Sequence, residues 1–239
     1  MNYPIYMDYN ATTPTDPQVL AAMLPYFSEH FGNAASRSHA FGWKADEAVE
    51  EAREKVADLI CASAKEIVFT SGATESINLA IKGVFEANFP KKNHIITAST
   101  EHKAVLDTCQ HLEKLGAEIT YLMPDNQGVM SLKELENAIK PTPILISMMA
   151  ANNEIGVIQD FREIGEIAKK NKILFHTDAT QAVGKIPLND IDDNIDLLSF
   201  SGHKIYAPKG VGILFVRKKV NIISQQDGGK QRNWCDSGF

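Results

Sequence analysis

Two ionisable side chains, Asp178 and Lys204, stand where apolar runs give way to loops. Asp178 closes the run 173–178, and Lys204 follows the run 195–202. A carboxylate at a strand end can keep a pyridine nitrogen protonated so that the ring withdraws electrons, and a nearby lysine amine can form a Schiff base with an aldehyde. A capping aspartate or a surface lysine explains either residue alone equally well. Their joint occurrence at neighbouring strand ends favours a site.

Two other loops carry side chains that suit a ligand. In the turn 71–74 (Ser-Gly-Ala-Thr) the glycine permits close approach of the backbone, and Thr74 can cap the following helix and contact a phosphate oxygen. His102 follows the run 94–99 and offers an imidazole that can stack on a flat ring or move protons. An ordinary capping turn and a surface histidine are the alternatives. Neither loop has the glycine pattern of a P-loop or of a dinucleotide-binding fold.

The apolar runs that end in these loops alternate with stretches of helical periodicity. This alternation is typical of an α/β fold in which helices sandwich a mostly parallel sheet, and ligands of such sheets bind at the carboxyl ends of the strands. The expected strands are 67–70, 94–99, 117–122, 144–150, 173–178, 195–202 and 212–216, and the expected helices are 43–60, 75–88, 102–115, 131–139 and 160–170.

Composition narrows the choice of partner. The chain has 239 residues, 44% of them hydrophobic, and a formal net charge of −6. Because nucleic-acid binders usually carry a basic patch, the acidic balance favours a small-molecule partner over nucleic acid. No run approaches the ~18 apolar residues of a membrane span, and the first residues lack the pattern of a signal peptide. We therefore expect a cytoplasmic protein with no membrane partner.

The three cysteines, Cys61, Cys109 and Cys235, show no spacing typical of a disulfide framework or a metal site. We therefore expect no metal ion. Cys61 and Cys109 are interpreted as small apolar residues packed within helices. Cys235 could in principle accept sulfur, but nothing around it lowers the pKa of a thiol, and it is interpreted as incidental.

Motifs along the whole chain carry a resemblance to a known family. They are the segments 6–14 (Tyr-Met-Asp-Tyr-Asn-Ala-Thr-Thr-Pro), 31–33 with 38–39, 69–76, 101–103 (Glu-His-Lys), 152–156, 176–185, 199–204 (Ser-Phe-Ser-Gly-His-Lys) and 208–212. Together these motifs resemble the NifS-like cysteine desulfurases of the class-V aminotransferase superfamily. The resemblance implies an aspartate-aminotransferase-like large domain, pyridoxal 5′-phosphate as cofactor, L-cysteine as substrate and a homodimer.

The resemblance also implies a role for each matching residue. Lys204 is the Schiff-base lysine and, with His102, a catalytic residue, and His102 also stacks on the cofactor ring. Asp178 pairs with the pyridinium nitrogen, and Asn153 and Gln181 contact the ring hydroxyl side or the substrate. The phosphate is cradled by Ala73, Thr74, Ser201 and His203.

The family pattern also suggests how the chain is divided. Residues 1–15 correspond to an arm or part of the family's small domain, 16–227 to the cofactor-binding large domain, and 228–239 to a divergent tail. The family's sulfur-accepting cysteine loop, its carboxylate-binding arginine and its small C-terminal domain have no counterpart in the sequence, which indicates a truncated member. Three readings stay open: a cofactor-binding protein without the cysteine segment, a non-functional gene remnant, and a lyase or transaminase that needs no cysteine.

Overall fold

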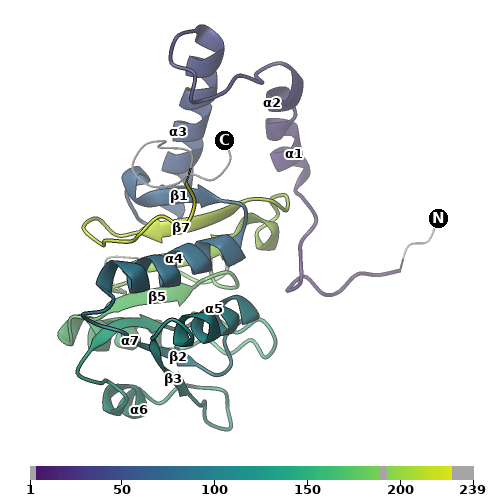
Figure 1. Ribbon diagram of the computed structural model, residues 1–239. Coiled ribbons are helices and arrows are strands. Elements are labelled where there is room, and N and C mark those ends of the chain that lie inside the picture. The colour runs from purple at the N-terminus through teal and green to yellow at the C-terminus, as the bar shows by residue number, and fades with distance from the viewer. Residues whose placement is uncertain (1–3, 189–192, 228–239) are drawn as a thin grey trace.

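The structure, a computed structural model, describes residues 4–188 and 193–227 (Figure 1). The predicted tail 228–239, with Cys235, lies outside the described residues. The strands are β1 (Ile67–Thr70), β2 (His94–Ala98), β3 (Glu118–Leu122), β4 (Pro143–Ser147), β5 (Leu174–Asp178), β6 (Leu197–Ser201) and β7 (Gly212–Val216). The helices are α1 (Pro17–Met23), α2 (Pro25–Ser28), α3 (Ala40–Leu59), α4 (Ala73–Asn88), α5 (Lys103–Glu113), α6 (Leu132–Asn137) and α7 (Phe161–Lys170).

The strands form one seven-stranded sheet in the order β1-β7-β6-β5-β4-β2-β3. The pairs from β6 to β3 are parallel, whereas β7 is antiparallel to both of its neighbours, β1 and β6. The predicted mostly parallel sheet is therefore confirmed. Because β7 is reversed between β1 and β6, strand β1 runs in the same direction as the parallel strands, and its carboxyl end opens at the same edge.

Helices cover both faces of the sheet, as its strands require. Most strands are buried at every position, so neither face can be left to water. Helices α4 and α5 pack on one face, and residues of α3, α6 and α7 join the core on the other. Helix α4 lies in front of the middle strands in Figure 1 and is apolar on most sides, with Ile77, Ala80, Ile81 and Val84 almost fully buried. This sandwich fixes the strand ends that carry the polar loops.

Two interpretations of single residues are tested by the fold. Cys109 is buried in α5, as expected for a small apolar residue in a helix. The expectation for Cys61 is wrong. It is exposed just after α3, at a φ of 58°, because the helix ends at Leu59 and the chain turns through a left-handed residue.

Candidate functional site

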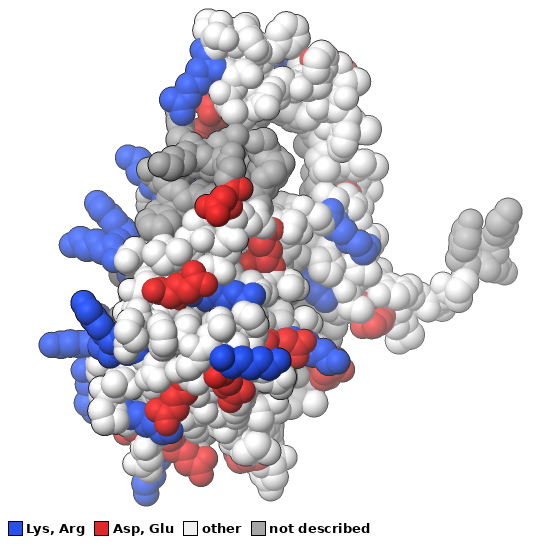
Figure 2. Space-filling model, in the orientation of Figure 1, with Lys and Arg blue, Asp and Glu red and all other residues white. Residues whose placement is uncertain are grey.

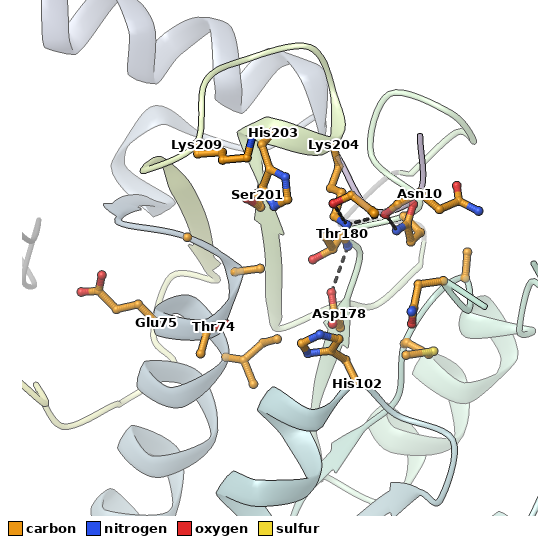
Figure 3. Close-up of a pocket in the computed structure, with 18 of the residues that line it drawn as sticks. Asn10, Thr74, Glu75, His102, Asp178, Thr180, Ser201, His203, Lys204 and Lys209 are labelled. Atoms are coloured by element: carbon orange, nitrogen blue, oxygen red, sulfur yellow. Dashed lines mark hydrogen bonds between the residues drawn. The ribbon is translucent and has the colours of Figure 1, made fainter. Parts of the chain in front are cut away.

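A cavity of about 630 Å³ lies at the carboxyl edge of the sheet (Figure 3). Its volume is in the range of small-molecule and cofactor sites. Every site residue expected from the sequence lines it: Ala73, Thr74, His102, Asn153, Asp178, Gln181, Ser201, His203 and Lys204.

Strand order explains why residues far apart in the sequence meet here. Lys204, Asp178, Asn153 and His102 follow or end β6, β5, β4 and β2, which are neighbours in the sheet and run parallel. The carboxyl ends of parallel strands meet at one edge, so their loops surround a common space. The turn after β1, which carries Thr74, joins them because β1 runs in the same direction.

Asp178 is the buried acid of the cavity, with 6% of its surface exposed. Its Oδ1 accepts a hydrogen bond of 3.0 Å from the backbone N–H of Thr180, drawn as a dashed line in Figure 3. Burial raises the pKa of Asp178, while the hydrogen bonding of Thr180 and the nearby His102 and Lys204 act in the opposite direction. A solvent-exposed capping aspartate is therefore the wrong reading.

A buried histidine supports the strand that ends in Asp178. His176 lies on β5, two residues earlier, and bridges to both neighbouring strands: Ser147 Oγ is 2.8 Å from its Nδ1 and Ser199 Oγ is 3.0 Å from its Nε2. Burial lowers the pKa of His176 to about 3, so the ring is neutral at physiological pH. Sequence reasoning gave this residue no role. Its only signal was a polar side chain inside an otherwise apolar run.

Lys204 closes the short 3₁₀ turn η2 (Gly202–Lys204) after β6, and its side chain enters the same cavity as Asp178 (Figure 3). Its Nζ donates to the carbonyl oxygens of Asn10 and Ala11, the latter at 2.8 Å. Partial burial and then the nearby Lys185 lower the pKa of Lys204, and the carboxyl groups of Asp8 and Asp178 oppose this shift. A lowered pKa increases the share of neutral, nucleophilic amine.

The N-terminal segment 4–16 forms one wall of the site. Thr13 donates through both its N–H and its hydroxyl to the carbonyl oxygen of His203, at 2.9 and 3.0 Å. The Gln181 side chain donates to the carbonyl oxygen of Asn10 at 2.9 Å, and Lys185 donates to Gln181 Oε1 at 2.7 Å. Patterns of periodicity could not find this wall, because the segment is irregular. Only the family motif at residues 6–14 pointed to it.

The other end of the cavity suits an anion. Helix α4 starts at Ala73 with Gly72 as its N-cap, and no side chain caps it, so its first-turn N–H groups lack partners within the helix. The expectation that Thr74 caps this helix is wrong, because it already lies in the first turn, where its side chain lines the cavity. Ser201 and His203 line the same cavity, and burial, followed by the charges of Lys204 and Lys209, lowers the pKa of His203.

His102 is the N-cap of α5, and its Nδ1 accepts a hydrogen bond of 3.1 Å from the backbone N–H of Ala104. An accepting Nδ1 places the proton of the neutral ring on Nε2. Figure 3 shows the ring beside Asp178 in the cavity. Asn153 also lines the cavity, and its Nδ2 donates to Glu154 at 2.9 Å.

Within 4–188 and 193–227, no group of three or more His, Cys, Asp or Glu side chains is placed to hold a metal ion. In the same part of the chain, no helix has the length and apolar character needed to cross a membrane.

Comparisons with known proteins agree with this geometry. The cysteine desulfurase IscS of Rickettsia felis is 57% identical over 239 residues, a match that covers 99% of this chain and 58% of the relative. Among solved structures, a NifS-like protein superposes with a TM-score of 0.93 at 45% identity over 95% of this chain and 63% of that one. A structure described as SspA in complex with cysteine gives 0.92 at 44% identity, over 95% and 66%.

The chain thus spans 58% of the length of the IscS relative. Residues 5–234 match the family described as aminotransferase class-V. Pyridoxal 5′-phosphate is the cofactor of this family and of IscS cysteine desulfurases. By sequence match, fold and the strand-end site, the chain belongs to the class-V aminotransferase family and is a homologue of its IscS and NifS-like cysteine desulfurases.

Proposed function

We propose that this chain binds pyridoxal 5′-phosphate in the cavity, with Lys204 as the lysine that bonds the cofactor. One observation carries the proposal: the amine of Lys204 and the buried carboxyl of Asp178 enter one cavity from the ends of adjacent parallel strands. A buried carboxyl is costly without a positive partner, and a protonated ring nitrogen supplies one. The residues present therefore fit the cofactor.

The phosphate would be held at the start of α4. The uncapped N–H groups of the first turn, the hydroxyl groups of Thr74 and Ser201, and the His203 ring line that end of the cavity. Helix N-termini favour phosphate through their N–H groups and dipole. Ala73, at the first helical position, contributes backbone rather than a side-chain contact.

The bound cofactor supplies an electron sink for the Cα of an amino acid. Asp178 would keep a proton on the ring nitrogen, which would make the ring electron-withdrawing. The Lys204 amine would take or return the proton at Cα, and its lowered pKa increases the share of neutral amine that can accept a proton. His102 would stack on the ring face, and Asn153 and Gln181 would contact its hydroxyl side or the substrate, because all three line the cavity.

We further propose L-cysteine as the substrate and its desulfuration to alanine as the reaction, because the relatives are cysteine desulfurases and one similar structure holds cysteine. Neither cysteine of the described residues is placed to accept the sulfur. Cys61 and Cys109 do not line the cavity, and burial raises the pKa of Cys109 to about 12, which keeps it from forming a thiolate. The proposal includes a cytoplasmic homodimer, as the family resemblance implies.

The test of cofactor binding is spectroscopic. Purified protein mixed with pyridoxal 5′-phosphate should gain a visible band, and borohydride reduction should leave the cofactor attached to Lys204 in a peptide mass map. Lys204→Ala should lose the band and the adduct. Lys133→Ala, which removes an exposed lysine on α6, should keep both. A wild-type chain that stays colourless, or an adduct on another lysine, contradicts the proposal.

Substrate class is tested separately on the loaded protein. L-cysteine should yield alanine, together with sulfide when excess thiol is supplied, because one thiol accepts the sulfur as a persulfide and a second thiol reduces that persulfide to sulfide and a disulfide. Pyruvate released with ammonia and sulfide would instead indicate a lyase, and mercaptopyruvate formed only when a keto acid is added would indicate a transaminase. A bound cofactor without any turnover would leave binding as the function of this chain and overturn the desulfuration proposal.

A further inference from the structure

A buried acid that the proposed chemistry does not use lies next to His102. Glu101 sits in the turn between β2 and α5 and is 6% exposed. Its Oε1 accepts a hydrogen bond of 2.8 Å from the backbone N–H of Met149, in the loop after β4. Its Oε2 is also buried and has no hydrogen-bond partner within the described part of the chain.

This hydrogen bond joins two loops that line the cofactor cavity. A second tie lies beside it, because Asn152 Nδ2 donates to the carbonyl oxygen of Thr100 at 3.0 Å. The Oδ1 of Asn152 in turn accepts from the N–H groups of Glu154 and Ile155 at 2.9 and 3.1 Å, which fixes the loop. His102 comes from one of the joined loops and Asn153 from the other.

The surroundings of Glu101 disfavour a negative charge on it. A buried carboxylate with one unpaired oxygen carries a large desolvation cost, and burial raises the pKa of Glu101 well above its ordinary value. The nearby carboxyl of Asp178, on β5, raises the pKa of Glu101 further, and Glu101 in turn raises the pKa of the Cys109 thiol on α5. By contrast, His102 and Lys204 favour the charged form of Asp178.

We propose that Glu101 is a positioning residue of the cofactor pocket, acting as an uncharged carboxylic acid that ties the His102 turn to the Asn153 loop and leaves Asp178 as the ionised carboxylate of the pair. This inference rests on the proposed cofactor site. When their surroundings hold two neighbouring acids in different protonation states, the two acids commonly have different roles. With Glu101 neutral, Asp178 carries the only negative charge of this pair, and that charge can face the ring nitrogen.

Three variants distinguish the effect of the hydrogen bond between Glu101 and Met149 from the effect of a charge on Glu101. Glu101→Gln keeps an oxygen for the N–H of Met149 and is neutral, whereas Glu101→Leu leaves that N–H buried and unpaired. The matched control is Gln159→Leu. Gln159 Oε1 accepts from the backbone N–H of Met130 at 2.9 Å, and Gln159 does not line the cavity. This control therefore removes a comparable buried hydrogen bond at the far end of the same loop, where the partner is Met130 and not the His102 turn.

The readouts are affinity for pyridoxal 5′-phosphate and the pH midpoint of its visible band. Glu101→Leu should lose about tenfold in affinity, as expected when a buried donor loses its acceptor. Glu101→Gln should stay within about twofold of wild type, with an unchanged midpoint, because it copies a neutral acid. Gln159→Leu should lose stability but not affinity. Equal cofactor affinity for Glu101→Leu and Gln159→Leu would overturn the positioning role. If Glu101→Gln lowered the pH midpoint of the visible band, as Asp178→Asn is expected to do, Glu101 would be shown to be charged.

Two readouts on the cofactor-free protein keep this test independent of the proposed function. Hydrogen exchange at the N–H of Met149 should be slow in wild type and Glu101→Gln and fast in Glu101→Leu. Urea unfolding should show Glu101→Gln gaining stability over wild type as pH rises above about 4.3, the ordinary pKa of glutamate. The sign follows because a raised folded-state pKa gives stability at low pH that is lost as pH climbs to that value. If no cofactor binds, these two results alone confirm or refute the hydrogen bond between Glu101 and Met149 and the uncharged state of the Glu101 carboxyl.

Discussion

At the scale of residues, the site depends on the buried carboxyl group of Asp178. Asp178 is almost fully buried, and its pKa is raised although Thr180, His102 and Lys204 favour its charged form. Such a carboxyl destabilises the cofactor-free fold and becomes useful only when a cation faces it. Function and stability are therefore opposed at this position.

Asp178→Asn should make this opposition measurable. Without cofactor the variant should be more stable than wild type, and the gain should grow as pH rises through the window above the ordinary aspartate pKa, because wild type loses stability there. Cofactor affinity should fall about thirtyfold, since a charge-assisted contact of about 2 kcal/mol is lost. Urea unfolding at pH 5 and pH 8 and a cofactor titration measure the two effects. A variant that is less stable at pH 8 than wild type would contradict the buried-charge account.

At the scale of elements, the anion end of the cavity depends on the close approach of β7 to the turn before α4. A Cβ built on Gly212 would lie 2.4 Å from Gly72 Cα and 2.7 Å from Gly72 N, distances that real Cβ atoms do not show. A Cβ on Gly72 itself meets nothing within 4 Å. The glycine at 212, rather than the one at 72, therefore sets how closely the strand and the turn pack.

Gly212→Ala should push the turn before α4 away from β7. We expect a loss of about 2 kcal/mol in the free energy of unfolding, as for other overpacked core positions, and weaker cofactor binding through the displaced phosphate end. Gly72→Ala should change the unfolding free energy by less than about 0.5 kcal/mol, because its φ of 163° is extended and its surroundings are open. Chemical unfolding of both variants measures this. Equal losses would show that Gly212 is not the tighter position.

At the scale of the whole molecule, the N-terminal helices stand apart from the core. Figure 1 shows α1, α2 and the start of α3 projecting beyond the sheet, and Figure 2 shows that part as largely uncharged in this view. Neither α1 nor α2 has a buried residue. Large apolar side chains are exposed there: Leu20, Leu24, Tyr26, Phe27, Phe31, Phe41 and Trp43. Apolar surface of this extent is typical of an interface, which agrees with the proposed homodimer.

The oligomeric state tests this reading of the surface. Sedimentation should give twice the 26.4 kDa mass of the chain at micromolar concentration. Leu24→Ser/Phe27→Ser should shift the protein to monomer with an unchanged circular dichroism spectrum, because both side chains are exposed, at 56% and 72%. Leu115→Ser, which changes a 50% exposed side chain after α5, is the control and should stay dimeric. A wild-type chain that is monomeric at every concentration refutes the dimer.

Local patterns were enough to place the strands, whereas the short helices α1 and α2 were not predicted. Every expected strand is present within a few residues of its predicted bounds, because continuous apolar runs between helical stretches admit few other folds. The ends were less well predicted. The run 144–150 leaves the strand after Ser147, although Met148 and Ala150 still donate to carbonyl groups of β5. The domain division at residues 15 and 227 stays a prediction.

The sequence by itself determined which residues could do chemistry, because Asp178, Lys204, His102 and the turn before α4 each follow an apolar run. The tertiary structure decided what those residues experience. Strand order, the reversed β7 and the packing of the N-terminal segment join parts of the chain that are up to 194 residues apart, as at Lys204 and Asn10. Burial of Glu101 and Asp178, and hence their protonation, is likewise a property of surroundings contributed by distant segments, and no local pattern encodes it.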